Sequence, residues 1–216
     1  VLISAIHFGI GDASFISEID SRTTNIGLPK ITYALAAGFT PVFLPLLGDG
    51  STEALTAVNP NLVGWALGFE NELFWLIAAL NLVAVTVMAL RRRWNEVVDL
   101  LLLLGISLVA PPLVAFAFYF GLWHALRHTG RLTLEYEKSQ LLHAQGKSWQ
   151  SFFKAFNAGV PALLLVLGFT VVWAQVAGFS LPAELLWLLL VVIWALTVPH
   201  MALTARLDAN AMGVRS

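Results

Sequence analysis

Long apolar runs alternate with short polar stretches along this chain, and the runs approach the roughly 20 residues that a helix needs to cross a bilayer. This pattern predicts an all-α, polytopic integral membrane protein with about six transmembrane or re-entrant helices. We find no internal repeat or linker, so we expect a single helical domain over residues 1–216. The predicted spans cover about 1–15, 28–47, 73–90, 97–128, 159–179 and 181–204.

Prolines interrupt two of these runs. Pro41 and Pro45 predict that the second span is kinked or re-entrant. Pro111 and Pro112 must break or kink the 97–128 run, because proline lacks an N–H and crowds the preceding turn.

The polar stretches between the spans carry two further predictions. We expect residues 48–61 to form an acidic loop. The stretch 149–156 carries four aromatic residues at one-face helical spacing, which predicts a helix lying in the membrane interface. These aromatic residues are Trp149, Phe152, Phe153 and Phe156.

The composition agrees with a membrane protein and excludes several kinds of site. Charged residues make up 12% of the chain, against about 25% in soluble domains. A net charge of −1 gives no general attraction to nucleic acid. Cysteine is absent, which excludes disulfides, zinc fingers and iron–sulfur clusters. The chain opens inside an apolar run without Met, so we expect further helices upstream.

Histidines are the ionisable residues that recur in or beside the apolar runs. His124 and His128 are four residues apart, so on a helix they share a face with Cβ atoms about 6 Å apart and can hold one metal ion. His7 lies in the first run, and Asp12 could hold a ligand histidine through its free N–H. His200 ends the last run. For His7 and His200, a histidine packed against a neighbouring helix remains an alternative. For His124 and His128, the alternative is a pair of interfacial histidines solvated near the lipid headgroups.

The donor set leaves the metal open. Three or four neutral imidazoles suit zinc, copper or iron. Iron with an open coordination position would activate O₂, and burial in the membrane would favour a lipid-soluble substrate. His143 lies in a polar stretch and is expected to be solvated without a ligand role. The candidate substrate contacts, for which simple packing is the alternative, are Phe8, Phe116, Tyr119, Phe120 and Trp123.

Three short motifs together carry a family resemblance. They are His-Phe-Gly-Ile-Gly-Asp at 7–12, Trp-His-Ala-Leu-Arg-His at 123–128 and Pro-His-Met at 199–201. In order and spacing, across nearly the whole chain, they resemble the bacterial and archaeal Brp/Blh-type β-carotene 15,15′-dioxygenases.

The resemblance implies a multi-pass protein of a prokaryotic cell membrane that depends on Fe²⁺. Such an enzyme cleaves the central double bond of β-carotene with O₂ to give two molecules of retinal. The resemblance also implies His7, His124 and His128 as iron ligands, with His200 as a further candidate.

The chain departs from the family pattern at two places. The family usually has Ser after the first histidine of the paired motif, where this chain has Ala125, which removes a hydroxyl but no ligand. The family also carries a histidine in an N-terminal His-Gly motif. This chain shows no such motif, and we expect it in the upstream part.

Other functions use similar residues. A membrane transporter could use the buried histidines and Asp12 as a proton relay. A di-iron hydroxylase or desaturase also uses His-x-x-x-His pairs, but it needs about twice the ligands that the five histidines of this chain supply. A haem protein would use axial histidines on separate helices. The expected partners are β-carotene, O₂ and the lipid bilayer, without nucleic acid; the sequence indicates no oligomeric state.

Overall fold

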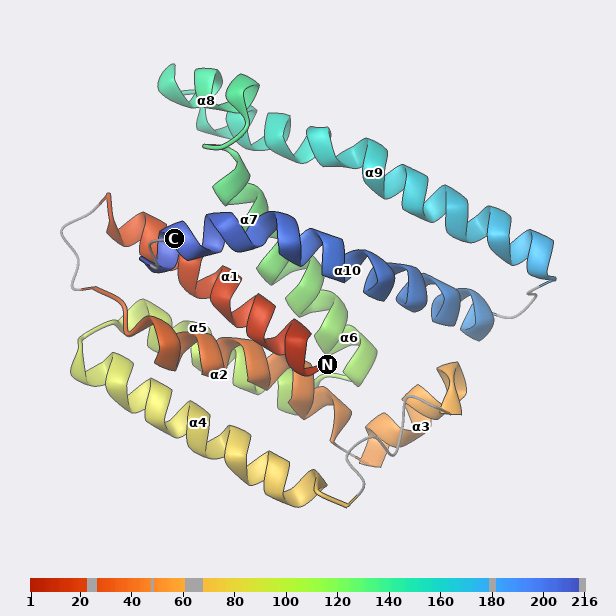
Figure 1. Ribbon diagram of the computed structural model, residues 1–216. Coiled ribbons are helices and arrows are strands. Elements are labelled where there is room, and N and C mark those ends of the chain that lie inside the picture. The colour runs from red at the N-terminus through yellow and green to blue at the C-terminus, as the bar shows by residue number, and fades with distance from the viewer. Residues whose placement is uncertain (23–26, 48, 61–67, 179–181, 214–216) are drawn as a thin grey trace. The chain divides into compact units, whose positions relative to one another are not determined.

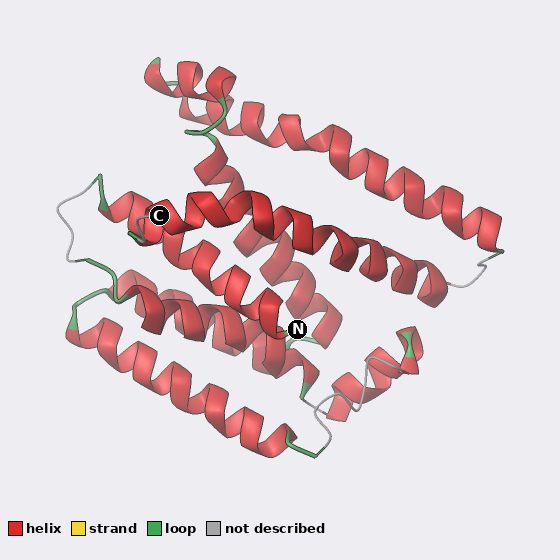
Figure 2. Ribbon diagram, in the orientation of Figure 1, coloured by secondary structure: helices red, strands yellow, loops and turns green. Residues whose placement is uncertain are grey.

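The computed structural model describes residues 1–22, 27–47, 49–60, 68–178 and 182–213. Within these ranges the chain is helical and has no strand (Figure 2), which confirms the predicted all-α class. The helices, including the 3₁₀-helix η1 and the π-helix η3, are α1 (Leu2–Asp20), α2 (Lys30–Phe43), η1 (Leu44–Leu46), α3 (Asp49–Val58), α4 (Glu70–Leu90), α5 (Trp94–Val109), α6 (Pro112–Ala117), η3 (Phe118–His124), α7 (Ala125–Leu132), α8 (Glu137–Ala144), α9 (Ser148–Ala177) and α10 (Pro182–Met212).

The helices form two compact units. The first consists of Val1–His124 together with Met201–Ser216, and the second of Ala125–His200. The first unit therefore contains α1 to η3 and the end of α10, while the second contains α7, α8, α9 and most of α10. The expectation of a single domain over the whole chain stays a prediction.

Helix α2 is the centre of the first unit and contacts α1, α4 and α5 (Figure 1). Helices α1 and α2 approach to backbone contact, because glycines face each other where they cross. A Cβ atom on Gly9 would overlap the carbonyl oxygen of Ala34, and one on Gly38 would overlap the carbonyl oxygen of Ala5. Small residues allow such close packing of membrane helices. The crossing fixes α1, the helix that carries His7 and Asp12.

A buried arginine joins the end of α1 to the start of α5. Arg92 turns the chain after α4 with a φ of 55°. Arg93 then donates to the Asp20 carboxylate at 2.7 and 3.1 Å and to Glu96 Oε1 at 2.6 Å. Burial disfavours the charge, but these hydrogen bonds outweigh it and raise the pKa of the Arg93 guanidinium. Arg93 therefore stays charged and holds two carboxylates.

Replacing Arg93 with alanine is expected to destabilise the protein by about 3 kcal/mol, because two largely buried carboxylates lose their counter-charge. Thermal unfolding of the detergent-solubilised protein measures the change. The matched control is Arg91→Ala, since Arg91 is exposed two residues earlier. Equal unfolding temperatures for the two variants would show that the Arg93 contacts do not stabilise the fold.

In the second unit, α8 and α9 form a helical hairpin (Figure 1). Two buried serines, one on each helix, hold the hairpin together by a reciprocal pair of hydrogen bonds. The Ser139 hydroxyl donates to the Ser151 carbonyl at 2.6 Å, and the Ser151 hydroxyl donates to the Ser139 carbonyl at 2.8 Å. Helix α9 ends at Gly178, whose backbone has the left-handed conformation that favours glycine (φ 71°). Helix α7 packs against α9. His128 lies on α7, so this packing positions it within the unit.

The predicted polytopic membrane class is confirmed. Among the described residues, four helices are long and apolar enough to cross a membrane, at Leu2–Asp20, Glu70–Leu90, Ser148–Ala177 and Glu184–Ala205. A fifth candidate is the bent pair Lys30–Leu46 and Ser51–Val58, with an angle of 79° at the break. The bend lies after Leu46 and not at the prolines, since α2 continues through Pro41 and Pro45 lies within η1. A kinked or re-entrant second segment caused by Pro41 and Pro45 stays a prediction.

The remaining predicted segment, 97–128, is broken at Pro111 and Pro112. Helix α5 precedes the break, and α6, η3 and α7 follow it as directly consecutive helical segments. Helix α5 has 16 residues and is too short to count as a span of its own. The proline pair ends α5 in extended backbone at Ala110, as a residue before proline prefers. The predicted break is confirmed. It explains why the described residues contain four or five candidate spans where the sequence predicted about six.

Two local predictions were wrong. Residues 49–58 form α3 rather than a loop, because Glu53, Ala54 and Leu55 are good helix formers. The stretch 149–156 is the beginning of α9, which continues through Pro161 without a break, and not a separate interfacial helix. Residues 48 and 61, the ends of the predicted loop, and residue 181, the predicted start of the last span, lie outside the described residues.

Candidate metal centre

His7 and His124 come together in the first unit, although 117 positions separate them in the chain (124 − 7). His7 lies on α1, and His124 is the last residue of η3. Their ring centroids are 5.6 Å apart at an interplanar angle of 66°, and both side chains are buried. Two rings bound to one ion through bonds of about 2 Å have centroids about 5 Å apart. The separation of the two rings therefore matches that of two imidazoles on one metal ion, and a shared ion stays a prediction.

The second unit contains a similar pair, His128 and His200. Their ring centroids lie 5.3 Å apart at 71°. His128 on α7 is partly buried, and His200 on α10 is exposed. The division between the units falls between His124 and His128, which remain four residues apart on consecutive helical segments.

The four histidines named as candidate ligands thus form two pairs. Among the described residues, no three histidine or carboxylate side chains come together as a set that could hold a metal ion. A four-histidine site stays a prediction. His143 is exposed on α8, as expected for a solvated residue.

Asp12 lies fully buried beside His124. Its Oδ1 is 3.4 Å from His124 Nδ1, and its Oδ2 accepts a hydrogen bond of 3.2 Å from the Tyr119 hydroxyl. Carboxylates commonly hold metal-binding histidines in this way, from the nitrogen that does not bind the metal. Asp12 thus lies next to His124, and its role as the supporting partner of a metal ligand stays a prediction.

Aromatic side chains surround His124. Phe8 is the central one, with its ring centroid 4.7 Å from that of His124, 5.6 Å from that of Tyr119 and 5.9 Å from that of Phe120. Phe116 stacks on Phe120 at 5.7 Å. Trp123 is half-buried at the edge of the hydrophobic core. The structure thus gathers most of the predicted substrate contacts into one apolar cluster around a histidine.

Sequence reasoning missed the roles of Tyr119 and Gly11 in this arrangement. Tyr119 was considered only for the substrate, yet its hydroxyl reaches Asp12. A Cβ atom on Gly11 would lie 2.9 Å from His124 Cε1, so the glycine provides the space for the ring. Glycines permit close approach of membrane helices, but the 7–12 motif does not show that the partner of Gly11 is a histidine ring.

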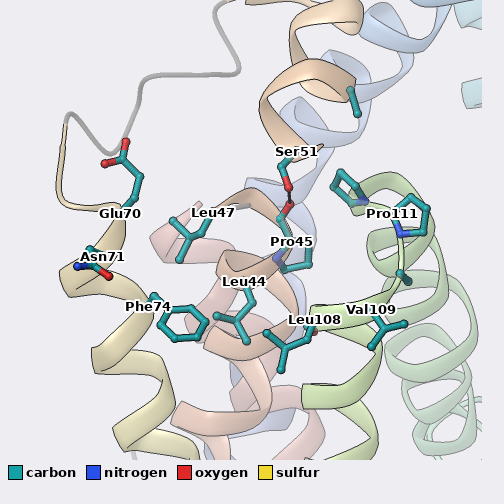
Figure 3. Close-up of a pocket in the computed structure, with 14 residues that line it drawn as sticks. Leu44, Pro45, Leu47, Ser51, Glu70, Asn71, Phe74, Leu108, Val109 and Pro111 are labelled. Carbon is teal, nitrogen blue, oxygen red and sulfur yellow. Dashed lines mark hydrogen bonds between the residues drawn. The ribbon is translucent and has the colours of Figure 1, made fainter. Parts of the chain in front are cut away.

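A pocket of about 750 Å³ lies elsewhere in the first unit, at η1 and the adjoining ends of α3 to α6 (Figure 3). Its wall combines apolar side chains such as Leu44 and Phe74 with the polar groups of Glu70, Asn71 and Ser51. The Ser51 hydroxyl donates to the Pro45 carbonyl at 2.5 Å. No candidate ligand lines this pocket, so it gives no support to the metal centre.

The fold and the paired histidines define a helical membrane protein with a candidate histidine metal centre. The sequence model of the β-carotene 15,15′-dioxygenase family matches residues 1–208. The chain therefore belongs to this family, as its three motifs suggested.

Two relatives agree with this assignment. A probable β-carotene 15,15′-dioxygenase, Blh, from Halobacterium salinarum is 28% identical over 225 residues, which cover 96% of this chain and 65% of the relative. A β-carotene 15,15′-dioxygenase from an uncultured marine bacterium is 29% identical over 132 residues, covering 59% of this chain and 44% of the relative. The chain thus spans less than two thirds of the length of each. No solved structure matches it.

Proposed function

We propose that this protein cleaves the central double bond of β-carotene with O₂, at a mononuclear iron held by histidines, to give two molecules of retinal. The observation that carries the proposal is the buried pair His7 and His124, backed by Asp12, in a helical membrane chain of this family. The names of the two relatives support the reaction. The proposed location is a prokaryotic cell membrane.

His7, His124 and His128 would hold the iron, with His200 as a fourth ligand. Neutral imidazole nitrogens suit ferrous iron, and within each unit the ring spacing fits a shared ion. His124 and His128 lie four residues apart, and this spacing is the reason for assigning both pairs to one ion. The bound iron would supply the activation of O₂.

The aromatic cluster around His124 would hold the substrate. β-Carotene has no polar groups, so its binding must come from burial of apolar surface and from shape. Phe8 and Phe120 offer such surface beside the candidate ligand. Cleavage breaks one C=C bond and gives one oxygen atom to each carbon. The reaction therefore balances with β-carotene and O₂ alone, without an external electron donor.

The direct test is retinal formation by the purified protein. Protein purified in detergent without oxygen is loaded with Fe²⁺ and then given β-carotene and O₂. We expect two retinal molecules for each β-carotene consumed. Removal of the iron with a chelator should abolish the reaction, and added Fe²⁺ should restore it. Chromatography of the products and metal analysis of the protein provide the two readouts.

The alternatives predict different results. Products of unequal length would contradict cleavage at the central bond, and full activity after chelation would contradict the iron. A transporter with a histidine and aspartate proton relay would purify without stoichiometric iron. A histidine-box hydroxylase or desaturase would need external electrons and two irons.

A further inference from the structure

Tyr119, Asp12 and His124 form a buried polar chain within the first unit. These three residues are 1%, 0% and 6% exposed. The Tyr119 hydroxyl donates to one oxygen of the Asp12 carboxylate, and the other oxygen lies 3.4 Å from His124 Nδ1. A buried carboxylate is costly unless its oxygens have partners. Tyr119 satisfies one oxygen and limits rotation of the carboxylate. The second oxygen has His124 Nδ1 as a polar neighbour at 3.4 Å, and a small movement of either side chain would bring the two atoms into a hydrogen bond.

The π-helix brings Tyr119 and His124 to the same side. They are five residues apart in η3, and a π-helix places residues five apart about one turn from each other. In an α-helix the same two residues would point about 140° apart. Their ring centroids are 6.2 Å apart. The local helix type thus decides that both side chains reach the single carboxylate of Asp12.

Gly11 leaves the space that the imidazole ring of His124 occupies. The three atoms nearest to a Cβ on Gly11 are Cε1, Nδ1 and Nε2 of His124, at 2.9, 3.7 and 3.9 Å. A contact of 2.9 Å is shorter than real Cβ atoms tolerate, so any larger residue must displace the imidazole. Asp12 follows Gly11 directly, so one turn of α1 provides both this space and the carboxylate.

We propose that Tyr119 and Gly11 are positioning residues for His124. Tyr119 acts through Asp12 to keep the proton on Nδ1, which leaves Nε2 for a metal ion, and Gly11 sets the place of the ring. The inference rests on the proposed function, in which His124 binds iron. Neither residue touches the iron or the substrate in this role.

The test measures Fe²⁺ affinity without oxygen, by competition with a chelator. We expect Tyr119→Phe to weaken Fe²⁺ binding about tenfold, at the lower end of what the loss of such supporting contacts costs. The matched control is Tyr33→Phe. Tyr33 is an equally buried tyrosine whose hydroxyl donates to Asp99 at 3.3 Å, between α2 and α5. This control should bind Fe²⁺ like the unchanged protein.

Gly11→Ala separates positioning from folding, because alanine favours a helix more than glycine does. It should keep the fold but weaken Fe²⁺ binding about tenfold by displacing His124. Gly105→Ala in α5 is its control, since a Cβ there meets no atom within 4 Å. Unchanged affinity in both Tyr119→Phe and Gly11→Ala would overturn the proposal.

The second readout needs no metal. In protein with ¹⁵N-labelled histidine, we expect the His124 signal of the metal-free protein to show a protonated Nδ1, and Tyr119→Phe to show a mixture of the two tautomers. Identical signals in the two proteins would overturn the positioning role. If the unchanged protein fails to bind iron, the iron-dependent part of the proposed function is wrong. The comparison of the ¹⁵N signals of the unchanged protein and Tyr119→Phe then decides the role of Tyr119 by itself.

Discussion

Replacing His124 with alanine is expected to abolish iron binding and retinal formation together. His124 is buried beside His7, Asp12 and Phe8, so its loss removes one of the two histidines of this pair, and alanine offers no donor in its place. Loss of a supporting contact already costs about 10- to 100-fold in metal affinity or activity. Loss of the ligand itself should therefore lower both iron content and retinal yield by more than about 100-fold.

His128→Ala should have the same effect if one ion takes both pairs. His143→Ala is the matched control, because His143 is exposed on α8. It should keep both iron and activity. The measurement is iron per protein molecule together with retinal by chromatography. Full iron content in His124→Ala would remove this residue from the site, and full iron in His128→Ala would limit the site to the first unit.

The spans were predictable because the bilayer imposes a simple requirement on the sequence. About 20 apolar residues, with few charges, suffice to recognise a helix such as α4 or α9. Proline breaks were predictable for the same local reason, as at Pro111 and Pro112. The ends of the helices were less predictable. The aromatic stretch from Trp149 belongs to α9, because this helix continues through Gly159 and Pro161, two residues that commonly end a helix.

The site was predictable only as a set of residue types. A buried histidine stands out in an apolar run, so His7 and His124 could be selected from the sequence. Their juxtaposition depends on the packing of α1 against η3, which no spacing encodes. The π-helix was also hidden, because the same apolar run suits an α-helix equally well. Only the contacts between η3 and α1 show that Tyr119 and His124 both lie next to the Asp12 carboxylate.

The contact between α1 and α2 leads to the second large effect. Gly38→Leu is expected to destabilise the protein by about 3 kcal/mol, the upper end of the usual cost of overpacking. The new side chain would overlap the carbonyl oxygen of Ala5 and the backbone of Gly9. These obstacles are backbone atoms within a helix, which cannot move aside as a flexible side chain can. The two helices would have to separate, and α1 would carry His7 and Asp12 away from His124.

Thermal unfolding in detergent and Fe²⁺ binding measure this effect. Gly105→Leu in α5 is the matched control, because it adds the same side chain where a Cβ meets nothing within 4 Å. It should unfold close to the temperature of the unchanged protein and keep its iron. Gly38→Leu should lose both stability and iron, because the crossing of α1 and α2 both holds the first unit together and places the histidine pair. An unfolding temperature of Gly38→Leu equal to that of Gly105→Leu would show that the two helices do not need this close contact.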